Sequence, residues 1–327
     1  MLRGPDMPSV YQTCRACGLN AYLADGRQVS NLTPMIDSLD HIIIAVRDLD
    51  AAKRTYTGIL GREPTQAGEH KGLGSSNLIF RLRNTYLEFV AATGEGLFAD
   101  MIRQKLETDG EGLIGLAFGT VNADACVARL RAAGLTPSDP QPGGATDTSA
   151  DGKTTERRWR NVMFPPKETG ELLMFVIEQE DRLAIPLSPL APGVNGRAAV
   201  EAVDHVVINT GDADRTIAFF RDQFGLRLAL DHTIDKWGVR QLFFRLGGLT
   251  LEIVSPIDDA KKPEKDSLWG MAYRCPDLVA MQARLKDAGI NVSELRTGRK
   301  KGTQVATVKP ETHGVPTLLI GEVYETA

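Results

Sequence analysis

The chain has 327 residues, of which 42% are hydrophobic and 24% are charged, and its formal net charge is −4. Such a composition is typical of a globular protein, and the length indicates about two domains. The negative balance excludes a strongly basic surface for nucleic acid, and no apolar run approaches the roughly 20 residues that span a bilayer. We therefore expect a cytoplasmic protein whose partners are small-molecule substrates or a second copy in a homodimer, with no nucleic acid and no membrane.

Residues 1–34 lack the charged and apolar regions of a secretory signal, and we expect them to be a dispensable N-terminal extension. Within them, Cys14 and Cys17 form a single CxxC, without the second pair or the neighbouring histidine that a tetrahedral zinc site needs. Cys126 and Cys275 are isolated in the sequence. Because cysteines in this pattern do not form a disulfide framework, a reducing compartment is expected.

The first predicted structural unit follows this extension. Its first strand begins at Leu39-Asp40-His41 and continues as the β-branched run IIIAV. Asp48 then caps a predicted helix that ends at Gly61. A strand over 77–82 leads through a short turn into a last strand that begins with Tyr86-Leu87-Glu88. The unit is therefore predicted as a strand, a helix and about three further strands.

The same pattern recurs in the second part of the chain. A strand that begins with Val203-Asp204-His205 precedes a predicted helix, and a later strand carries Thr250-Leu251-Glu252. The separation of histidine and glutamate is identical in the two copies, since 88 − 41 and 252 − 205 both equal 47. Self-similarity of this kind indicates a duplicated structural unit.

Two weaker copies begin with LIGLAF and LWGMAY and end with LLMFVIE and TLLIGE. They carry apolar residues, Leu113 and Met174 in one and Leu268 and Leu319 in the other, where the stronger copies have histidine and glutamate. The chain is therefore predicted to be an α+β protein built from four βαβββ modules.

Two segments rich in proline and glycine interrupt these modules. Residues 138–153 are predicted to form a long surface loop inside module two, which could serve as a lid, and residues 185–196 mark the best domain boundary. We therefore assign the first domain to 35–182, a linker to 183–200 and the second domain to 201–327.

The strand motifs, with LDHIIIAVRDLDAA and VDHVVINTGDADRTIAFF as the strongest, resemble the vicinal oxygen chelate superfamily of glyoxalases, dihydroxybiphenyl dioxygenases and bleomycin-resistance proteins. The resemblance covers 37–323. It implies two cupped, mixed-sheet barrels in which a first-strand His and a last-strand Glu point at a divalent metal. Alternation agrees, because it places His41 with Ile43 and Glu88 with Val90 on one strand face. Such ligands suit Fe, Mn, Ni, Co or Zn, and the sequence does not choose among them.

The predicted metal ligands are His41, Glu88, His205 and Glu252. The alternative is that Asp-His is a packing motif and that the glutamates pair with a buried arginine or face water, since a buried carboxylate needs a partner. In two enzymes of the family that the chain resembles, glyoxalase I and methylmalonyl-CoA epimerase, the metal ligands come from both modules of one barrel. Here each barrel would supply one His and one Glu, unless modules one and three share a barrel.

His70 and His232 could provide a third ligand or transfer protons, although they lie at unequal distances, 18 and 20 residues, before the glutamates (88 − 70 and 252 − 232). Their alternative is a surface or hydrogen-bonded histidine. Asn77 and Gln241 occupy equivalent places and could orient a substrate, or only bond along the strand edge. His313 is expected in a turn. Four aromatic residues could line a pocket, although such residues are more often core: Trp237, Phe243, Phe244 and Trp269.

The resemblance implies three candidate functions. The first is a metal-dependent lyase or isomerase acting on a small carbonyl or vicinal-oxygen substrate, in which Glu88 or Glu252 alternates between ligand and base and His70 assists proton transfer. The second is an extradiol ring-cleaving dioxygenase, which the four-module length favours and the leucines at 268 and 319 weaken. The third is a non-catalytic small-molecule binding or resistance protein without metal.

Overall fold

The computed structural model describes residues 21–22, 28–29, 35–70, 72–149 and 152–323. Contacts divide the chain into two units, Met1–Pro34 and Met35–Ala327. In the first unit, β1 (Ala21–Tyr22) pairs with β2 (Gln28–Val29). The CxxC of Cys14 and Cys17 lies outside the described residues. Within the described ranges, no helix is long and apolar enough to cross a membrane.

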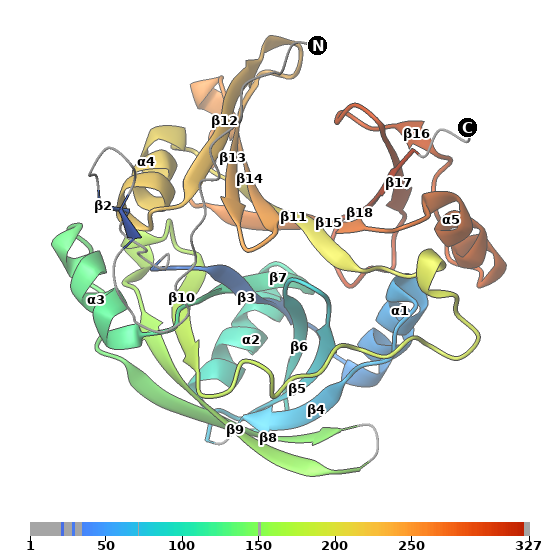
Figure 1. The fold of residues 1–327 in the computed structure, drawn as a ribbon, viewed down its shortest axis with the longest axis horizontal. Helices are drawn as coiled ribbons and strands as arrows, with labels where there is room; N and C mark the ends of the chain where they lie inside the picture. The colour runs from blue at the N-terminus through green and yellow to red at the C-terminus, as the bar shows by residue number, and fades with distance from the viewer. Residues whose placement is uncertain (1–20, 23–27, 30–34, 71, 150–151, 324–327) are drawn as a thin grey trace, which may run out of the picture. The chain divides into compact units, whose positions relative to one another are not determined.

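Modules one and two together form one closed barrel with the strand order β10-β7-β3-β6-β5-β4-β8-β9 (Figure 1). The barrel strands are β3 (Ser38–Ala45), β4 (Gln66–His70), β5 (Ser75–Arg81), β6 (Tyr86–Ala92), β7 (Gly112–Gly119), β8 (Gln141–Ser149), β9 (Thr154–Met163) and β10 (Leu173–Gln179). The helices of this half are α1 (Leu49–Leu60), α2 (Leu97–Thr108) and α3 (Ala123–Ala132), with a 3-10 turn η1 (Pro166–Glu168). The arrangement in which modules one and three share a barrel is therefore wrong.

The predicted surface loop over 138–153 is also wrong, because most of it is strand β8. This strand pairs with β4 on one side and β9 on the other, and so completes the barrel. The glycines have a packing role here, since a Cβ on Gly143 would lie 2.3 Å from Nε1 of Trp159. Two flanking ladders thus outweigh the turn preference of proline and glycine in this segment.

The helix predicted after the first strand is confirmed as α1. The Asp48 side chain accepts hydrogen bonds from the backbone N–H groups of Asp50 and Ala51, which satisfies donors at the helix start. The helix ends at Gly61, whose φ of 68° suits glycine. Its buried face, which includes Tyr56, packs on the outside of the sheet, where the Tyr56 and Phe89 ring centroids are 4.4 Å apart.

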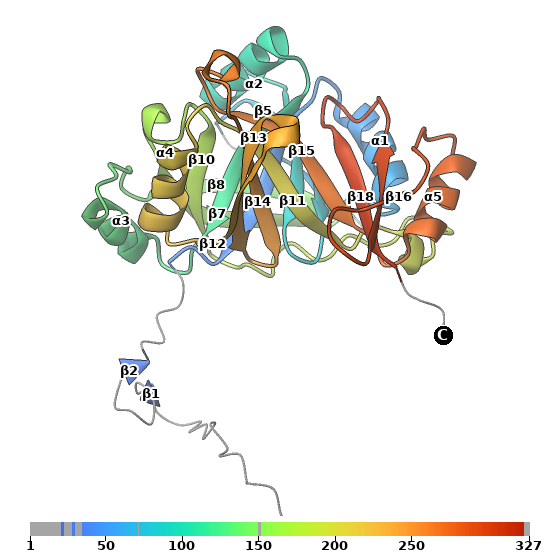
Figure 2. The same ribbon diagram turned by 90° about the horizontal axis from the view of Figure 1, so that it is seen from above.

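Helix α2 lies across one end of the barrel. Figure 1 shows it within the ring of strands, and Figure 2 places it at one end of that ring. Its Ile102 and Leu106 join Ile43 and Phe175 in a hydrophobic cluster, and Phe98 packs against them. Burial of these side chains stabilises the position of α2 and excludes water from the barrel interior at that end.

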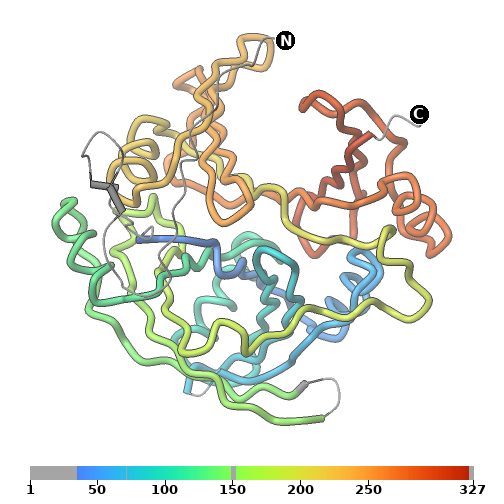
Figure 3. The backbone as a smooth tube through the Cα atoms, in the orientation of Figure 1, coloured from blue at the N-terminus to red at the C-terminus, as the bar shows by residue number. Residues whose placement is uncertain are grey.

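Modules three and four form a second eight-stranded sheet, in the order β12-β13-β14-β11-β15-β18-β17-β16, that does not close (Figures 1 and 3). Its strands are β11 (Ala202–Asn209), β12 (Arg227–Ile234), β13 (Val239–Leu246), β14 (Leu249–Pro256), β15 (Ser267–Arg274), β16 (Arg296–Thr297), β17 (Thr303–Val308) and β18 (Thr317–Glu322). Its helical segments are η2 (Gly196–Ala198), α4 (Ala213–Ile217), the π-helical η3 (Ala218–Gln223), η4 (Asp235–Trp237), η5 (Asp259–Lys261) and α5 (Leu278–Asp287).

The two halves differ most in the connection between their modules. In the first half α2 fills it, whereas in the second half only the short turn η5 lies between β14 and β15. The concave face of the second sheet therefore lacks a helical cover. The two halves share one hydrophobic cluster, in which the ring centroids of Phe118 on β7 and Phe224, just after η3, are 5.3 Å apart. The mixed α+β architecture expected from the sequence is thus present, with one closed and one open sheet.

Candidate active site

His41 and Glu88 meet inside the closed barrel. β3 and β6 are parallel neighbours in which Ile43 lies opposite Glu88, so alternation turns His41 and Glu88 to the same interior face. The His41 Nε2 atom lies 3.3 Å from Glu88 Oε2, and both side chains are almost fully buried. Module one thus supplies an imidazole and a carboxylate to one point in the barrel.

His70, at the end of β4, approaches the same carboxylate from the other side. Its Nε2 atom lies 3.2 Å from Glu88 Oε1, and its Nδ1 lies 2.9 Å from Ser75 Oγ. Asn77 donates a hydrogen bond of 2.6 Å from Nδ2 to the same Glu88 oxygen. The structure therefore brings together the predicted residues His41, His70, Asn77 and Glu88, all from module one.

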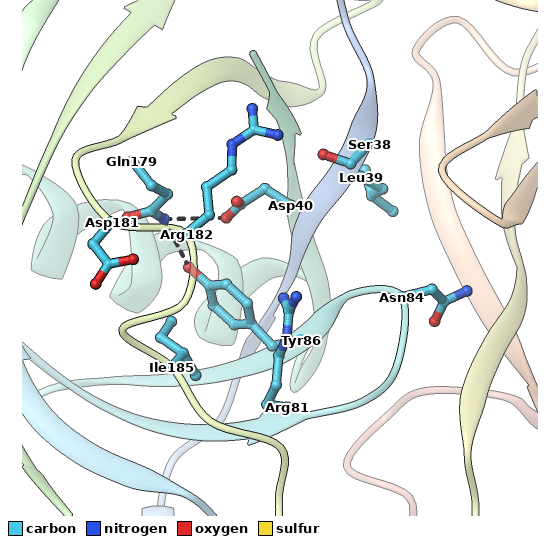
Figure 4. A pocket seen from close by; sticks show the side chains of 10 residues that line it. All are labelled: Ser38, Leu39, Asp40, Arg81, Asn84, Tyr86, Gln179, Asp181, Arg182 and Ile185. Carbon is cyan, nitrogen blue, oxygen red and sulfur yellow. Dashed lines mark hydrogen bonds between the residues drawn. The ribbon is translucent and has the colours of Figure 1, made fainter. Parts of the chain in front are cut away.

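A layer of polar groups behind His41 fixes its orientation. Asp40 Oδ1 lies 2.7 Å from His41 Nδ1, and Gln179 donates from Nε2 to Asp40 at 3.2 Å and to the Tyr86 hydroxyl at 3.4 Å (Figure 4). The imidazole also stacks on the Tyr86 ring, with centroids 4.7 Å apart. A carboxylate on Nδ1 leaves Nε2 free to bind a metal, which is the usual support of a ligating histidine.

The charge of Glu88 is stabilised despite its burial. Burial raises the pKa of this carboxyl, but the hydrogen bonds from His70 and Asn77 and the charges of His41 and His70 outweigh it, so the pKa lies well below its usual value. Asp40 behaves similarly, because contact with His41 and Gln179 overcomes the effect of burial and lowers its pKa. Both carboxylates are therefore anionic at neutral pH.

The donor set fits a divalent transition metal. Two imidazole nitrogens and one carboxylate are the ligands of many mononuclear iron sites. Ligand atoms about 2.1 Å from one ion at right angles are about 3 Å apart, close to the two His–Glu separations given above. Within the described ranges, however, no group of three or more His, Cys, Asp or Glu side chains is placed so that it could hold a metal ion. The two histidines contact separate oxygens of Glu88, so metal binding would require these side chains to move.

These side chains line a cavity of about 230 Å³ beneath α2. Among the described residues that line it, ten are apolar, and they include Phe98, Trp159 and Phe175. The polar residues that line it are His41, His70, Tyr86, Glu88, Arg157, Asn161 and Gln179. A second cavity, of about 180 Å³, shares the wall of Tyr86 and Gln179 with the first and is drawn in Figure 4.

The second half repeats part of this arrangement. His205 Nε2 lies 3.4 Å from Glu252 Oε2, Asp204 lies 3.0 Å from His205 Nδ1, and Gln241 donates to Glu252 Oε1 at 2.7 Å. The His205 and Glu252 side chains are 17% and 13% exposed, against 5% and 7% for His41 and Glu88. The duplicated pair is therefore real, but it is more open to water.

Among its described residues, the second half has no equivalent of His70. On β4, His70 pairs across the ladder with Ser75, two residues before the amide side chain of its module. On β12, His232 pairs with the amide residue itself, Gln241, and the position equivalent to His70 is held by Ile234. His232 is exposed, and no described contact joins it to Glu252. His70 lies 18 residues before Glu88, whereas His232 lies 20 residues before Glu252. Because of this offset of two residues, His70 lines the cavity and His232 lies at the surface.

The other sequence candidates are placed as follows. Phe244 is core, whereas Trp237 and Trp269 are 47% and 55% exposed in the open half. The Arg299 guanidinium stacks 3.8 Å from the Trp237 ring centroid. His313 lies in a turn, as expected.

The sequence analysis missed Arg157, which lines the cavity, and its buried partner Asp147. Asp147 accepts hydrogen bonds from Nε and Nη2 of Arg157, and both side chains are buried. Asp147 falls in the segment that was predicted to be a loop. The sequence did contain a signal for Arg157, because alternation in TTERRWRNVM places Arg157, Trp159 and Asn161 on one strand face.

Comparison with known families gives two matches that together cover most of the chain. The profile of the glyoxalase-like domain matches residues 39–202, and that of the glyoxalase/bleomycin resistance protein/dioxygenase superfamily matches residues 204–307. No curated protein sequence matches the chain at a meaningful level.

Several solved structures share the fold across both halves. A mutant of 4-hydroxymandelate synthase from Streptomyces coelicolor is 16% identical, with a TM-score of 0.62 and coverage of 89% of this chain and 95% of the other. A hypothetical protein from Staphylococcus aureus is 11% identical, with a TM-score of 0.59 and coverage of 88% and 100%. A fusion of a xylose isomerase-like TIM barrel with 4-hydroxyphenylpyruvate dioxygenase is 13% identical, with a TM-score of 0.55 and coverage of 89% and 49%. These likenesses establish the fold alone.

Proposed function

The chain belongs to the glyoxalase-like family of the vicinal oxygen chelate superfamily, and from this membership and the barrel site we propose a divalent-metal-dependent dioxygenase of the extradiol type. Its substrate would be a small molecule with two neighbouring oxygen atoms. The observation that carries the proposal is the set of two histidines and one glutamate at the wall of a mostly apolar cavity in the closed barrel.

His41, His70 and Glu88 would hold the metal. When bound, the ion would supply a site for two substrate oxygens and for dioxygen. Asn77 keeps the Glu88 carboxylate in position, and Asp40 holds His41 with Nε2 facing the cavity. Helix α2 and the aromatic walls exclude water from the reacting atoms.

Two features favour this reaction over the lyase or isomerase expected first from the sequence. Three protein donors leave more metal positions for substrate and dioxygen than the four-donor set of the lyases does. Removal of a proton from carbon needs a free base, but Glu88 is the only carboxylate among the described residues that line the cavity, and His41, His70 and Asn77 already contact its oxygens. Extradiol cleavage needs no external reductant, since one dioxygen takes four electrons from the substrate and both its atoms enter the ring-opened product.

Two structural neighbours, a fusion that contains 4-hydroxyphenylpyruvate dioxygenase and a mutant of 4-hydroxymandelate synthase, are consistent with oxygen chemistry on this fold. The open second half, with its His–Glu pair and no third ligand among the described residues, suits a binding role instead. We therefore propose a non-catalytic binding role for the second half and the catalytic role for the barrel.

The proposal is tested with an oxygen electrode on protein reconstituted with Fe(II), with catechol as the probe substrate. We expect oxygen consumption coupled to ring opening, loss of at least about 100-fold in His70→Ala, and little change in the matched variant His232→Ala. Turnover that requires glutathione and consumes no oxygen would favour the lyase instead. Equal loss in both variants would show that His70 has no special role.

A further inference from the structure

A second cavity lies next to the barrel site and shares the wall of Tyr86 and Gln179 with it. Its volume is about 180 Å³. Since a cavity of about 150 Å³ is enough for benzene, this one has room for about six non-hydrogen atoms. Among its lining residues, Asp181 is exposed and the Arg182 side chain is 35% exposed, so a ligand can enter from the surface.

Four charged side chains line this second cavity, two of each sign (Figure 4). They are Asp40, Asp181, Arg81 and Arg182. A ligand that carries both a positive and a negative charge would find an opposite partner for each charge that leaves water. A ligand with one charge would instead meet two side chains of its own sign. The wall therefore favours a zwitterion.

The two arginines offer hydrogen-bond donors to such a ligand. The Nη1 atom of Arg182 donates to the Asp37 carboxylate at 3.0 and 2.8 Å, but its Nη2 atom is buried and has no hydrogen-bond partner in the described part of the chain. The Arg81 guanidinium lies 5.9 Å from the Tyr86 ring centroid, and no described carboxylate forms an ion pair with it. An unpaired buried donor is costly, and a carboxylate is the acceptor that suits a guanidinium best.

Asp40 is the polar link from the second cavity to the barrel site. Its side chain lines the cavity and is 10% exposed. Its Oδ1 atom lies 2.7 Å from His41 Nδ1 and accepts a hydrogen bond from Gln179 at 3.2 Å. A ligand ammonium group beside Asp40 would attract the same negative charge and so weaken the interaction of this carboxylate with His41.

We propose that the second cavity binds the zwitterion of a small α-amino acid and that this ligand acts on His41 through Asp40. Its carboxylate lies at the two arginines and its ammonium group at the two aspartates. Because a carboxylate on Nδ1 strengthens a histidine ligand, the bound amino acid weakens metal binding at His41. Only this last consequence rests on the proposed function.

The test of binding compares three probes on the metal-free full chain by isothermal titration calorimetry. The probes are L-alanine, propionate, which lacks the ammonium group, and ethylamine, which lacks the carboxylate. We expect alanine to bind at least about tenfold more tightly than either of the others, since each of them loses charge-assisted hydrogen bonds at one end. No binding of alanine, or equal binding of the three probes, would overturn the proposal.

Two variants test the place of binding. Arg81→Leu removes a cation from the cavity wall, and the affinity for alanine should fall about tenfold or more. Arg83→Leu is the matched control, because Arg83 is 71% exposed and pairs with Glu201 at 3.5 Å outside this cavity. Equal affinities in the two folded variants would refute the role of Arg81. If Arg81→Leu fails to fold, the comparison of the three probes still decides.

Nitrogen-15 NMR of labelled histidines measures the effect on His41. The second half provides the control, because Asp204 lies 3.0 Å from His205 Nδ1 but lines neither cavity. Saturating alanine should shift the Nδ1 resonance of His41 and leave that of His205 unchanged, with His41→Ala and His205→Ala used to assign the signals. Equal shifts, or no shift at His41, would refute the action through Asp40. Because the protein is metal-free throughout, failure of the dioxygenase proposal affects neither readout.

Discussion

Replacement of Asp147 by alanine should destabilise the protein strongly, because it leaves Arg157 as an uncompensated buried charge. The two side chains are 0% and 4% exposed, and Asp147 receives two hydrogen bonds from the guanidinium. Removing one partner of such a buried pair costs about 3–5 kcal/mol. That is a large share of the roughly 5–15 kcal/mol by which a domain is stable.

The control for this experiment lies one residue along the same strand. Arg158 pairs with Glu180 at 2.8 Å, but these side chains are 72% and 62% exposed, so Glu180→Ala should have an effect near the median of exposed pairs, about 0–1 kcal/mol. Urea unfolding followed by circular dichroism measures both. The double variant Asp147→Ala/Arg157→Leu should recover much of the loss, since no charge is then left unpaired. If Asp147→Ala costs no more than Glu180→Ala, the pair is not buried as described.

Three further predictions follow from the same region and from the core. In metal-free protein, the lowered pKa of Glu88 contributes stability above its ordinary value of 4.5 that is lost as pH falls, so the urea midpoint should decline less from pH 7 to pH 3 in Glu88→Gln than in the wild type; equal slopes would contradict this. Gly68→Ala should cost about 1–3 kcal/mol, because the new Cβ would lie 2.5 Å from a β8 carbonyl oxygen, and an unchanged urea midpoint would count against this register. Burial raises the pKa of Cys126 to about 11 and of Cys275 to about 12, so a chain whose two N-terminal cysteines are serine should resist iodoacetamide at pH 8 until unfolded, as mass spectrometry would detect.

The strand residues of the site were predictable from the sequence because two independent patterns agree on them. Alternation turns His41 and Glu88 to one side, and the repeat places His205 and Glu252 at the same spacing. The structure brings each pair within 3.4 Å. Neither pattern required knowledge of the strand order.

The third histidine could not be chosen from the sequence, because the choice depends on ladder register. His70 and His232 differ by two residues in their distance from the glutamate, and only the pairing of β4 with β5 and of β12 with β13 shows which of them reaches the site. The same pairing places Gly68 opposite Asn77, at the position that His232 occupies in the other half. A local spacing argument treats the two histidines alike.

The closure of one barrel and the openness of the other sheet also depend on long-range contacts. Strand β8 forms in a segment rich in proline and glycine because β4 and β9 provide partners on both sides. Helix α2 has no counterpart in the second half, so the repeat pattern contained no signal for it. Strand β8 and helix α2 therefore enclose the cavity of the first half, whereas the concave face of the second half stays exposed.

We propose that His41, His70 and Glu88 form the metal site and that the second half, in which no third ligand lies among the described residues, does not. The most direct test is the metal content per chain, measured by mass spectrometry on protein made without an affinity tag and reconstituted with Fe(II). We predict about one equivalent in the wild type, retention in His205→Ala and His232→Ala, and loss in His41→Ala and His70→Ala. Full retention in His70→Ala, or loss in His205→Ala, would contradict the account.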